Sequence, residues 1–503
     1  MRRRGWPARR ALLAAAVALA TSCLDFGALE EGFCDSGTSV ACAEPICAAP
    51  CDSPPGPCFG PSTGCDPVLG CQYPVLVGTG CDDGDACTFD DRCNAGGRCV
   101  GTAYGCPGTE CASSSCLGDG GCAAPVPRTG QPCDAGVCRA DGVCSTFSYS
   151  PSNFDPAAVA ARGIAPSISI DCDNAWFNST DGGQFWCPGQ PAPVQTVVSE
   201  AGGPEVVVLA TSGLSMSGSG LLTLVGSRPV ILAVWGDAVI GGTVSTGSNT
   251  STGAGAGQDP PGICDAQGGL VSGLFGGGGG GGSYGSRGAD GGNADAVARG
   301  GRSGSLSGSA ALVPLRGGCP GGSGGRSVDP SASRGHGGAG GGAVQISAAG
   351  ALTVSGAVTA SAAAGQGGLG VLSGGNGGGG GGSGGAVLLE GWDVSIPSSG
   401  KLTANGGGGG GGGGVANGST GTDGSPTGEV PAPGGAGGIA CAGGGGQGAS
   451  TQASAQAGGN AASLCSGGGG GGGVGRIRVN GHGTCNAGAG VQSPVPTYGG
   501  TCP

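Results

Sequence analysis

The densest group of residues that could do chemistry in this chain is acidic. Asp82, Asp83 and Asp85 surround a glycine, and Asp90 and Asp91 follow closely. Crowded carboxylate oxygens are the ligands that Ca²⁺ prefers, which makes the first three residues a candidate calcium site. However, no glutamate closes an EF-hand loop, and Asp and Gly at these spacings also form Asx turns. We favour the turns and keep Ca²⁺ as the alternative; no other cofactor is expected.

Groups for catalysis are scarce. The chain has a single Lys, Lys401, and two His, His336 and His482, which argues against an ordinary metalloenzyme and against a Ser-His-Asp hydrolase. A glycosidase with two carboxylates stays as an alternative. The acids that lie within the strands expected below, without a Lys or Arg cluster beside them, are Asp237, Glu390 and Asp393.

Cysteine use indicates the compartment. The 27 Cys are too many for a reducing environment and indicate an oxidising one. Eighteen of them lie between Cys34 and Cys144 with few apolar residues among them, so disulfides must supply the order that a small core cannot. A zinc site there would need reduced thiolates, and the stretch has no His. The pairs expected further along are Cys172 with Cys187, Cys264 with Cys319, Cys441 with Cys465, and Cys485 with Cys502.

One part of this cysteine-rich region resembles a known repeat. The string C-D-D-G-D-x-C-T-x-x-D-x-C begins at Cys81, and further cysteines continue it to Cys99. It resembles the Cys-rich repeat of slime-mould extracellular-matrix proteins, and also repeats of myxobacterial secreted proteins. The resemblance implies an extracellular, structural or adhesive role without catalysis.

The N-terminus is typical of an export signal. Five Arg within the first ten residues precede an apolar run at 11–20, which is too short to span a bilayer but suits a signal peptide. The run ends in Ala20-Thr21-Ser22-Cys23, which resembles a bacterial lipobox; lipidation of Cys23 would leave an even number of cysteines. We expect a signal peptide at 1–22 and a lipid-anchored tether at 23–33, with plain secretion as the alternative.

Removing the signal peptide has an electrostatic consequence. It takes away five Arg and no acid, so the net charge of −12 becomes more negative by five. An acidic chain repels phosphate, and nucleic acid is therefore not an expected partner.

Glycine dominates the composition, with 126 Gly and 33 Pro, while charged residues make up 10% and aromatic residues 4%. No strict G-X-Y triplet recurs, which excludes collagen. Between the glycines lie short β-branched runs at 206–209, 221–225 and 230–235, and similar copies of three short strands at 229–245, 342–360 and 385–406. Each copy has the length of one turn of a parallel β-helix. We expect residues 201–503 to form an all-β, right-handed parallel β-helix-like solenoid; a β-sandwich is the main rival.

Long Gly-rich insertions follow the third strand of each copy. Two interpretations are open: flexible display loops, because ordering glycine has the largest entropy cost, or a bundle of polyglycine II-like strands that bond through their backbones. The first is favoured, although Cys264, Cys319, Cys441 and Cys465 count against complete disorder. The insertions run over 247–341, 361–384 and 406–473, and they contain unbroken glycine runs at 276–282, 377–382, 406–414 and 467–473.

The segment at 145–200 links the cysteine-rich module at 34–144 to the strands and is the most aromatic part of the chain. We expect it to close the open end of the stacked strands; a carbohydrate-stacking face is the alternative. Its aromatic residues are Phe147, Tyr149, Phe154, Trp176, Phe177, Phe185 and Trp186.

Taken whole, the chain resembles the Gly-rich, Cys-rich surface lipoproteins of myxobacteria. The resemblance implies a bacterial protein at the outer membrane or cell surface, anchored through lipid, with a structural or adhesive role and no catalysis. Its expected partners are the membrane, through the anchor, and an extracellular polysaccharide or matrix protein. The alternative function is a secreted polysaccharide-active β-helix enzyme, a lyase or hydrolase.

Overall fold

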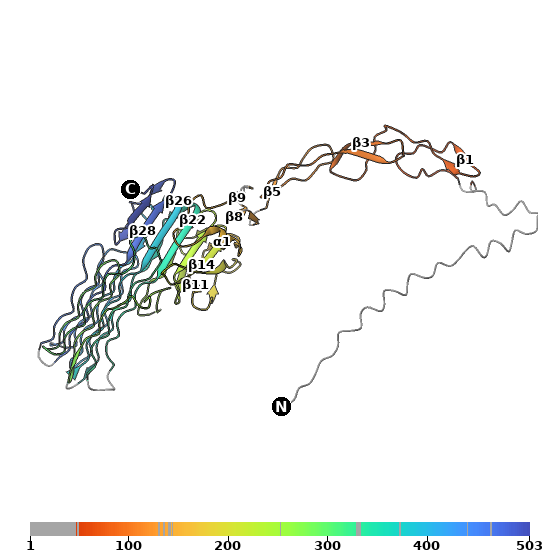
Figure 1. Ribbon diagram of the computed structural model, residues 1–503. Coiled ribbons are helices and arrows are strands. Elements are labelled where there is room, and N and C mark those ends of the chain that lie inside the picture. The colour runs from red at the N-terminus through yellow and green to blue at the C-terminus, as the bar shows by residue number, and fades with distance from the viewer. Residues whose placement is uncertain are drawn as a thin grey trace, which may run out of the picture. The chain divides into compact units, whose positions relative to one another are not determined.

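In the computed structural model the chain forms two compact units (Figure 1). The first comprises Met1–Cys106 and Ser115–Ala124, and the second comprises Pro107–Ser114 and Pro125–Pro503. Cys23, the expected signal peptide and the tether lie outside the described residues. The structure describes residues 47 and 50–502, except 129–130, 134–135, 139–141, 143, 252, 328–332, 372–373, 440 and 463–464.

Disulfides organise the first unit. Strand β1 (Gly64–Asp66) pairs antiparallel with β2 (Gly70–Gln72), and β3 (Thr88–Cys93) pairs antiparallel with β4 (Cys99–Ala103). No apolar cluster is found among the residues described in this unit. Each cross-link restricts the unfolded chain and contributes about 2–4 kcal/mol. The six disulfides described here are Cys47–Cys65, Cys51–Cys71, Cys58–Cys93, Cys81–Cys99, Cys87–Cys116 and Cys106–Cys122.

Small hairpins and a short helix begin the second unit. Disulfides Cys111–Cys138 and Cys133–Cys144 cross-link the hairpins. Helix α1 (Pro156–Ala160) is the one α-helix among the described residues, and the Asp155 side chain caps it by accepting a bond from the Ala157 amide. The hairpin strands are β5 (Ala112–Ser113), β6 (Val126–Pro127), β7 (Pro132–Cys133), β8 (Gly136–Cys138) and β9 (Cys144–Ser145).

Two sheets built largely of parallel strands follow. In the larger sheet, one row of parallel strands runs β14, β17, β22, β26, β28 and β31, and a second row runs β10, β15, β18, β22, β26 and β29. Antiparallel β13 (Val194–Ser199) borders β14. The bounds are β10 (Ile168–Ile170), β14 (Glu205–Thr211), β15 (Leu214–Met216), β17 (Val230–Val234), β18 (Ala238–Ile240), β22 (Ala343–Val354), β26 (Ala386–Ser395), β28 (Arg476–Gly481), β29 (Cys485–Asn486) and β31 (Thr497–Gly500).

The second sheet has seven strands in the order β12, β11, β16, β19, β23, β27 and β30. All neighbours are parallel except β11 and β12. The strands are β11 (Ala175–Asn178), β12 (Gln184–Phe185), β16 (Leu221–Val225), β19 (Thr243–Ser245), β23 (Ala357–Thr359), β27 (Lys401–Thr403) and β30 (Val491–Ser493).

Aliphatic side chains in equivalent positions stack between these sheets. The row Leu209, Leu232, Ile346, Leu389 and Val479 has each residue opposite the next on the neighbouring strand, and all five are buried. Such burial contributes about 1.5–3 kcal/mol per side chain. The described chain is therefore nearly all β, as predicted, with a disulfide-rich N-terminal region. Neither sheet closes on itself within the residues described.

The Gly-rich insertions are ordered, which contradicts the favoured expectation of flexible loops. They leave after β19, β23 and β27 and return at β22, β26 and β28, and they run side by side away from these strands (Figure 1). We call residues 247–341, 361–384 and 406–473 together the glycine bundle. Its glycine runs are mostly buried, and apart from Gly276 they are neither helical nor part of a strand ladder.

Backbone hydrogen bonds within the glycine bundle repeat every third residue. In the run 276–282, successive amides donate to three different neighbouring segments before the cycle repeats. A three-residue period is that of the polyproline II conformation, in which backbone groups point outward in three directions. The amides of Gly277 and Gly280 donate to the carbonyls of Leu270 and Gln267, respectively. In the same order, the amides of Gly278 and Gly281 donate to Gly292 and Ala289, and those of Gly279 and Gly282 to Gly378 and Gly381.

Further cross-links secure the bundle and the C-terminus. Disulfides join Cys264 to Cys319 and Cys441 to Cys465 within the bundle, and Cys485 to Cys502 near the end of the chain. These are the pairs expected from the sequence. Four two-residue strands pair within the insertions, in the order β20 (Val271–Ser272), β21 (Phe275–Gly276), β25 (Gly374–Gly375) and β24 (Gly370–Val371).

Candidate functional site

The acidic cluster of the first unit forms Asx turns. The Asp83 carboxylate accepts bonds from the amide of Asp85, at 2.9 Å, and from the Thr88 hydroxyl, and these bonds lower its pKa. Asp82 and Asp85 accept bonds from amides two residues further along. Carboxylate oxygens of Asp82, Asp83 and Asp91 lie within 4.8 Å of one another; Asp85 is not part of that group. The residues therefore serve the local turns, and the carboxylates that converge are not the three that the sequence suggested.

Glu390, one of the three acids expected within the strands, is buried, with 1% of the residue exposed. It accepts hydrogen bonds from the side chains of Ser152, Gln345, Ser347 and Asn480, and from the Ser152 amide at 3.1 Å. Ser152 lies in the segment at 145–200, which we call the connector. The other donors lie in strands β22 and β28, on either side of β26. Glu390 thus joins the connector to three adjacent strands, and its oxygens are used for that purpose.

The other two acids expected within the strands, Asp393 and Asp237, also accept hydrogen bonds from backbone amides. Asp393 accepts from the amide and the hydroxyl of Thr484, at 2.7 and 2.6 Å, and these bonds hold its pKa below the usual value. Asp237 accepts from the Ala351 amide at 2.8 Å. Both carboxylates therefore fix neighbouring strands and turns.

A stacked pair of rings lies close to Glu390. The rings of Tyr149 and His482 are 4.0 Å apart and inclined by only 11°, and the Tyr149 hydroxyl donates to the Ala348 carbonyl. Burial and the charge of Glu390 raise the pKa of Tyr149, whereas burial lowers that of His482. This cluster could not be recognised in the sequence, because its members are far apart in the chain.

The connector's aromatic residues divide into two groups. Phe154, Phe177 and Trp186 are buried, and Phe147 packs edge-on against Trp235 with ring centroids 5.2 Å apart. These residues occupy the interior positions that a cap requires.

Two connector aromatics face outward instead. Trp176 and Phe185 are 41% and 39% exposed, and they lie directly opposite each other on β11 and β12. The Cys172–Cys187 disulfide brackets this hairpin. The exposed pair is therefore a rigid apolar surface that the cap does not need.

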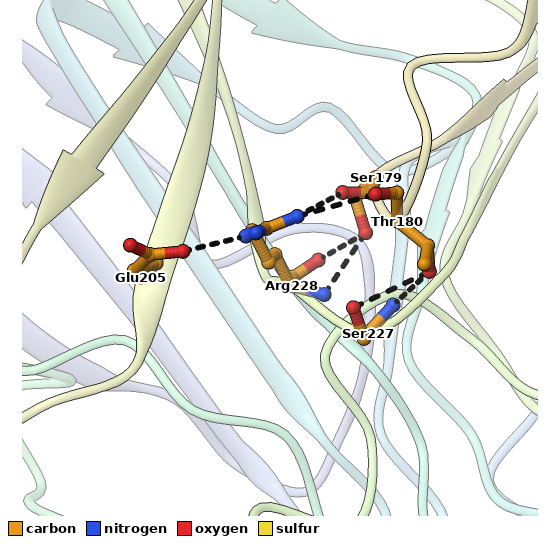
Figure 2. A network of polar contacts seen from close by, with 5 residues as sticks. All are labelled: Ser179, Thr180, Glu205, Ser227 and Arg228. Atoms are coloured by element: carbon orange, nitrogen blue, oxygen red, sulfur yellow. Dashed lines mark hydrogen bonds and ion pairs between the residues drawn. The ribbon is translucent and has the colours of Figure 1, made fainter. Parts of the chain in front are cut away.

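An arginine holds the turn that joins β11 to β12 (Figure 2). The Arg228 guanidinium forms an ion pair with Glu205 at 2.9 Å and donates to the carbonyls of Ser179 and Thr180. The Ser179 hydroxyl, in turn, donates to the Arg228 carbonyl and accepts from its amide. The Thr180 hydroxyl accepts from the Ser227 amide. The hairpin that carries the aromatic pair is thereby fixed to the turn between β16 and β17.

A row of hydroxyl groups continues from Trp176 across the outer face of the second sheet. Inward neighbours such as Phe177 and Leu222 are buried, whereas Thr223 is partly exposed, which sets the direction of the face. We call this set of outward-facing, mutually opposed residues the hydroxyl row; its members are Thr223, Ser245, Thr359, Thr403 and Ser493.

A polar hollow lies on the side of the glycine bundle. Arg334, Gln366, Asn417 and Thr420 line it, together with glycine backbone. More of its lining is polar than apolar, and it is not where the aromatic pair lies.

Comparisons with protein-family models, with curated proteins and with solved structures give no match. Within the described part of the chain, no helix is both long and apolar enough to cross a membrane. The twelve disulfides described indicate an oxidising, extracellular or exported setting.

Proposed function

We propose that this protein is a cell-surface lipoprotein of a bacterial outer membrane, with a structural or adhesive role and no catalytic activity. Its partners would be the membrane, through a lipid on Cys23, and an extracellular polysaccharide or matrix protein. The observation that carries the proposal is the glycine bundle. Three insertions bond to one another through their backbones, which gives an ordered body built largely from glycine backbone.

Rigidity of this kind suits adhesion. A surface that is already ordered loses little conformational entropy when it binds, so weak contacts contribute more of their energy to affinity. Several such contacts on one body add up to useful avidity. The tight bonding of Glu390 and its burial favour this role over the polysaccharide-active enzyme.

We further propose that the strands are coils of a right-handed parallel β-helix-like solenoid. The first two coils would be β14, β15 and β16, followed by β17, β18 and β19. Two features of the sheets support this proposal. Equivalent strands follow one another in the same order in both sheets, and they pair in parallel. The three insertions of the glycine bundle would then leave the coils at one corner, after β19, β23 and β27.

Fractionation of cells tests the anchor. The wild-type protein is expected in the membrane fraction, and Cys23→Ser in the medium. Retention of Cys23→Ser in the membrane would contradict lipid anchoring, and release of the wild type would favour plain secretion.

The role itself is tested by deletion of the gene, with cell–cell and cell–matrix contact as the readout. Loss of contact that wild-type protein restores supports adhesion, and contact unchanged by the deletion contradicts it.

Incubation of the purified protein with polysaccharides, followed by an assay for new chain ends, tests for catalysis. Cleavage that disappears in Glu390→Ala or Asp393→Ala would establish the enzyme instead.

A further inference from the structure

We infer that the outer face of β11, β16 and β19, beginning at Trp176 and Phe185, binds an extended neutral polysaccharide. The inference deepens the proposed adhesive function and rests on it, because it gives the adhesive surface a location and a class of ligand. Four observations carry it: the exposed rings, their rigid support, the free hydroxyls beside them and the lack of ionisable side chains among the outward-facing residues of these strands.

The aromatic pair provides the stacking surface. A pyranose ring has one face of C–H groups, and this face packs on an aromatic ring while the sugar hydroxyls stay at the rim. Trp176 and Phe185 keep about two fifths of their surface exposed, at 41% and 39%. Covering them gains hydrophobic free energy, and two adjacent rings favour a chain of sugars over a single sugar.

The support of the pair is fixed before any ligand arrives. The Cys172–Cys187 bond closes the base of the hairpin, and Arg228 holds its turn (Figure 2). Gly183 allows Trp176 to lie over the turn, since a Cβ atom at Gly183 would be 3.3 Å from the indole. Little ordering is therefore required on binding.

Free hydroxyls extend the surface from the rings. Thr223 and Ser245 in the hydroxyl row, and Thr243 beside Ser245, are partly exposed. Their hydroxyls have no hydrogen-bond partner among the described residues. Adjacent strands lie about 4.8 Å apart, so these groups form a regular series of donors and acceptors along which an extended polyol can lie.

The buried half of the hydroxyl row shows how an extended chain binds there. The Thr403 hydroxyl donates to the Pro426 carbonyl at 2.8 Å, and Ser493 accepts from the Thr451 amide at 2.9 Å. Part of the glycine bundle therefore covers Thr403 and Ser493 and uses their hydroxyls. Thr223 and Ser245 offer the same chemistry without a cover.

Charge selects the kind of polymer. None of the outward-facing residues of β11, β16 and β19 is ionisable, so the face gives an acidic polymer or a phosphate no counter-charge to bind. A neutral polysaccharide fits best. These residues are Trp176, Asn178, Leu221, Thr223, Val225, Thr243 and Ser245.

Affinity electrophoresis of the purified full chain tests the inference. The gels contain mixed-linkage β-glucan, galactomannan or amylose as neutral probes, and gelatin as a polypeptide probe. At least one neutral probe is expected to retard the native protein. Trp176→Ala should weaken that binding about tenfold, and Thr223→Val, which removes a hydroxyl at nearly constant shape, about threefold.

Trp392→Ala is the matched control, because Trp392 is 42% exposed on another strand and its loss should leave retardation unchanged. Thermal unfolding of each variant shows that it is folded. Three results would overturn the inference: Trp176→Ala binds as tightly as the wild type, Trp392→Ala loses as much binding as Trp176→Ala, or gelatin alone retards the protein. Absence of retardation would overturn it too, while cell contact that depends on the protein would still support adhesion. If Trp176→Ala loses retardation while cell contact is unaffected by deletion of the gene, only the adhesive role is contradicted.

Discussion

A Cβ atom placed on Gly469 would lie 1.9 Å from the carbonyl oxygen of Gly379, which belongs to a different glycine run. The same holds for Gly409, whose Cβ atom would lie 2.1 Å from the carbonyl of Gly469. These runs approach so closely that only hydrogen fits between them, as at the axis of collagen. Glycine therefore sets the spacing of the bundle, and its flexibility is not what the fold uses.

Gly469→Ala should accordingly destabilise the protein by about 3 kcal/mol or more, because the backbone on both sides must move apart. Gly444→Ala is the matched control within the bundle: its Cβ atom would be 3.6 Å from the Gly435 carbonyl, an ordinary contact. The control should change stability by less than about 1 kcal/mol, in either direction. Thermal or denaturant unfolding measures both, and equal effects would contradict close packing of the runs.

Amides within the glycine bundle should resist hydrogen exchange. Those of Gly279 and Gly282 are buried and bond to Gly378 and Gly381, each at 2.9 Å. Their exchange requires opening of the bundle, so their protection should approach that of the strand amides. The exposed Gly488 provides the comparison and should exchange rapidly. Exchange of the bundle amides as fast as that of Gly488, measured by NMR, would show that the runs are loops.

The strands were predictable because side chains encode them. In Val230–Val234 and in the copies beginning near Ala343 and Ala386, aliphatic residues recur at equivalent positions, and the structure sets these copies opposite each other. The order of the bundle was not predictable in this way. Its bonds join backbone to backbone, so an unbroken glycine run carries no pattern that identifies its neighbours. Only the cysteines within the insertions signalled order.

The candidate site shows the same division. Adjacent Trp176 and Phe177 must face opposite sides of a strand, but the sequence does not say which one faces the core. Glu390 was recognisable as an acid within a strand, whereas its partners Ser152 and Asn480 are distant in sequence and join it only in the fold.

Glu390→Ala should lower the free energy of unfolding by about 3 kcal/mol or more. It removes the acceptor of several buried donors, and an unsatisfied buried donor costs about 1–3 kcal/mol. Asp393→Ala is the comparison. Its carboxylate is at the surface and bonds to Thr484 alone among the described residues, so that variant should lose much less. A loss in Asp393→Ala as large as that in Glu390→Ala, measured by denaturant unfolding, would contradict a structural role for the buried cluster.

Glu200 should make stability fall as pH rises. Burial raises the pKa of its carboxyl group to about 7 from 4.5, against the opposing effects of a bond from the Leu315 amide and the charge of Arg316. Between these two values the folded state holds a proton that the unfolded state has released, so stability is fully present below pH 4.5 and is lost as pH rises through 7. Partial exposure reduces the effect to about 1 kcal/mol. Glu200→Gln removes the titrating group, so between pH 4.5 and 8 its free energy of unfolding should fall less than that of the wild type. Parallel pH profiles for the two proteins would contradict the shift.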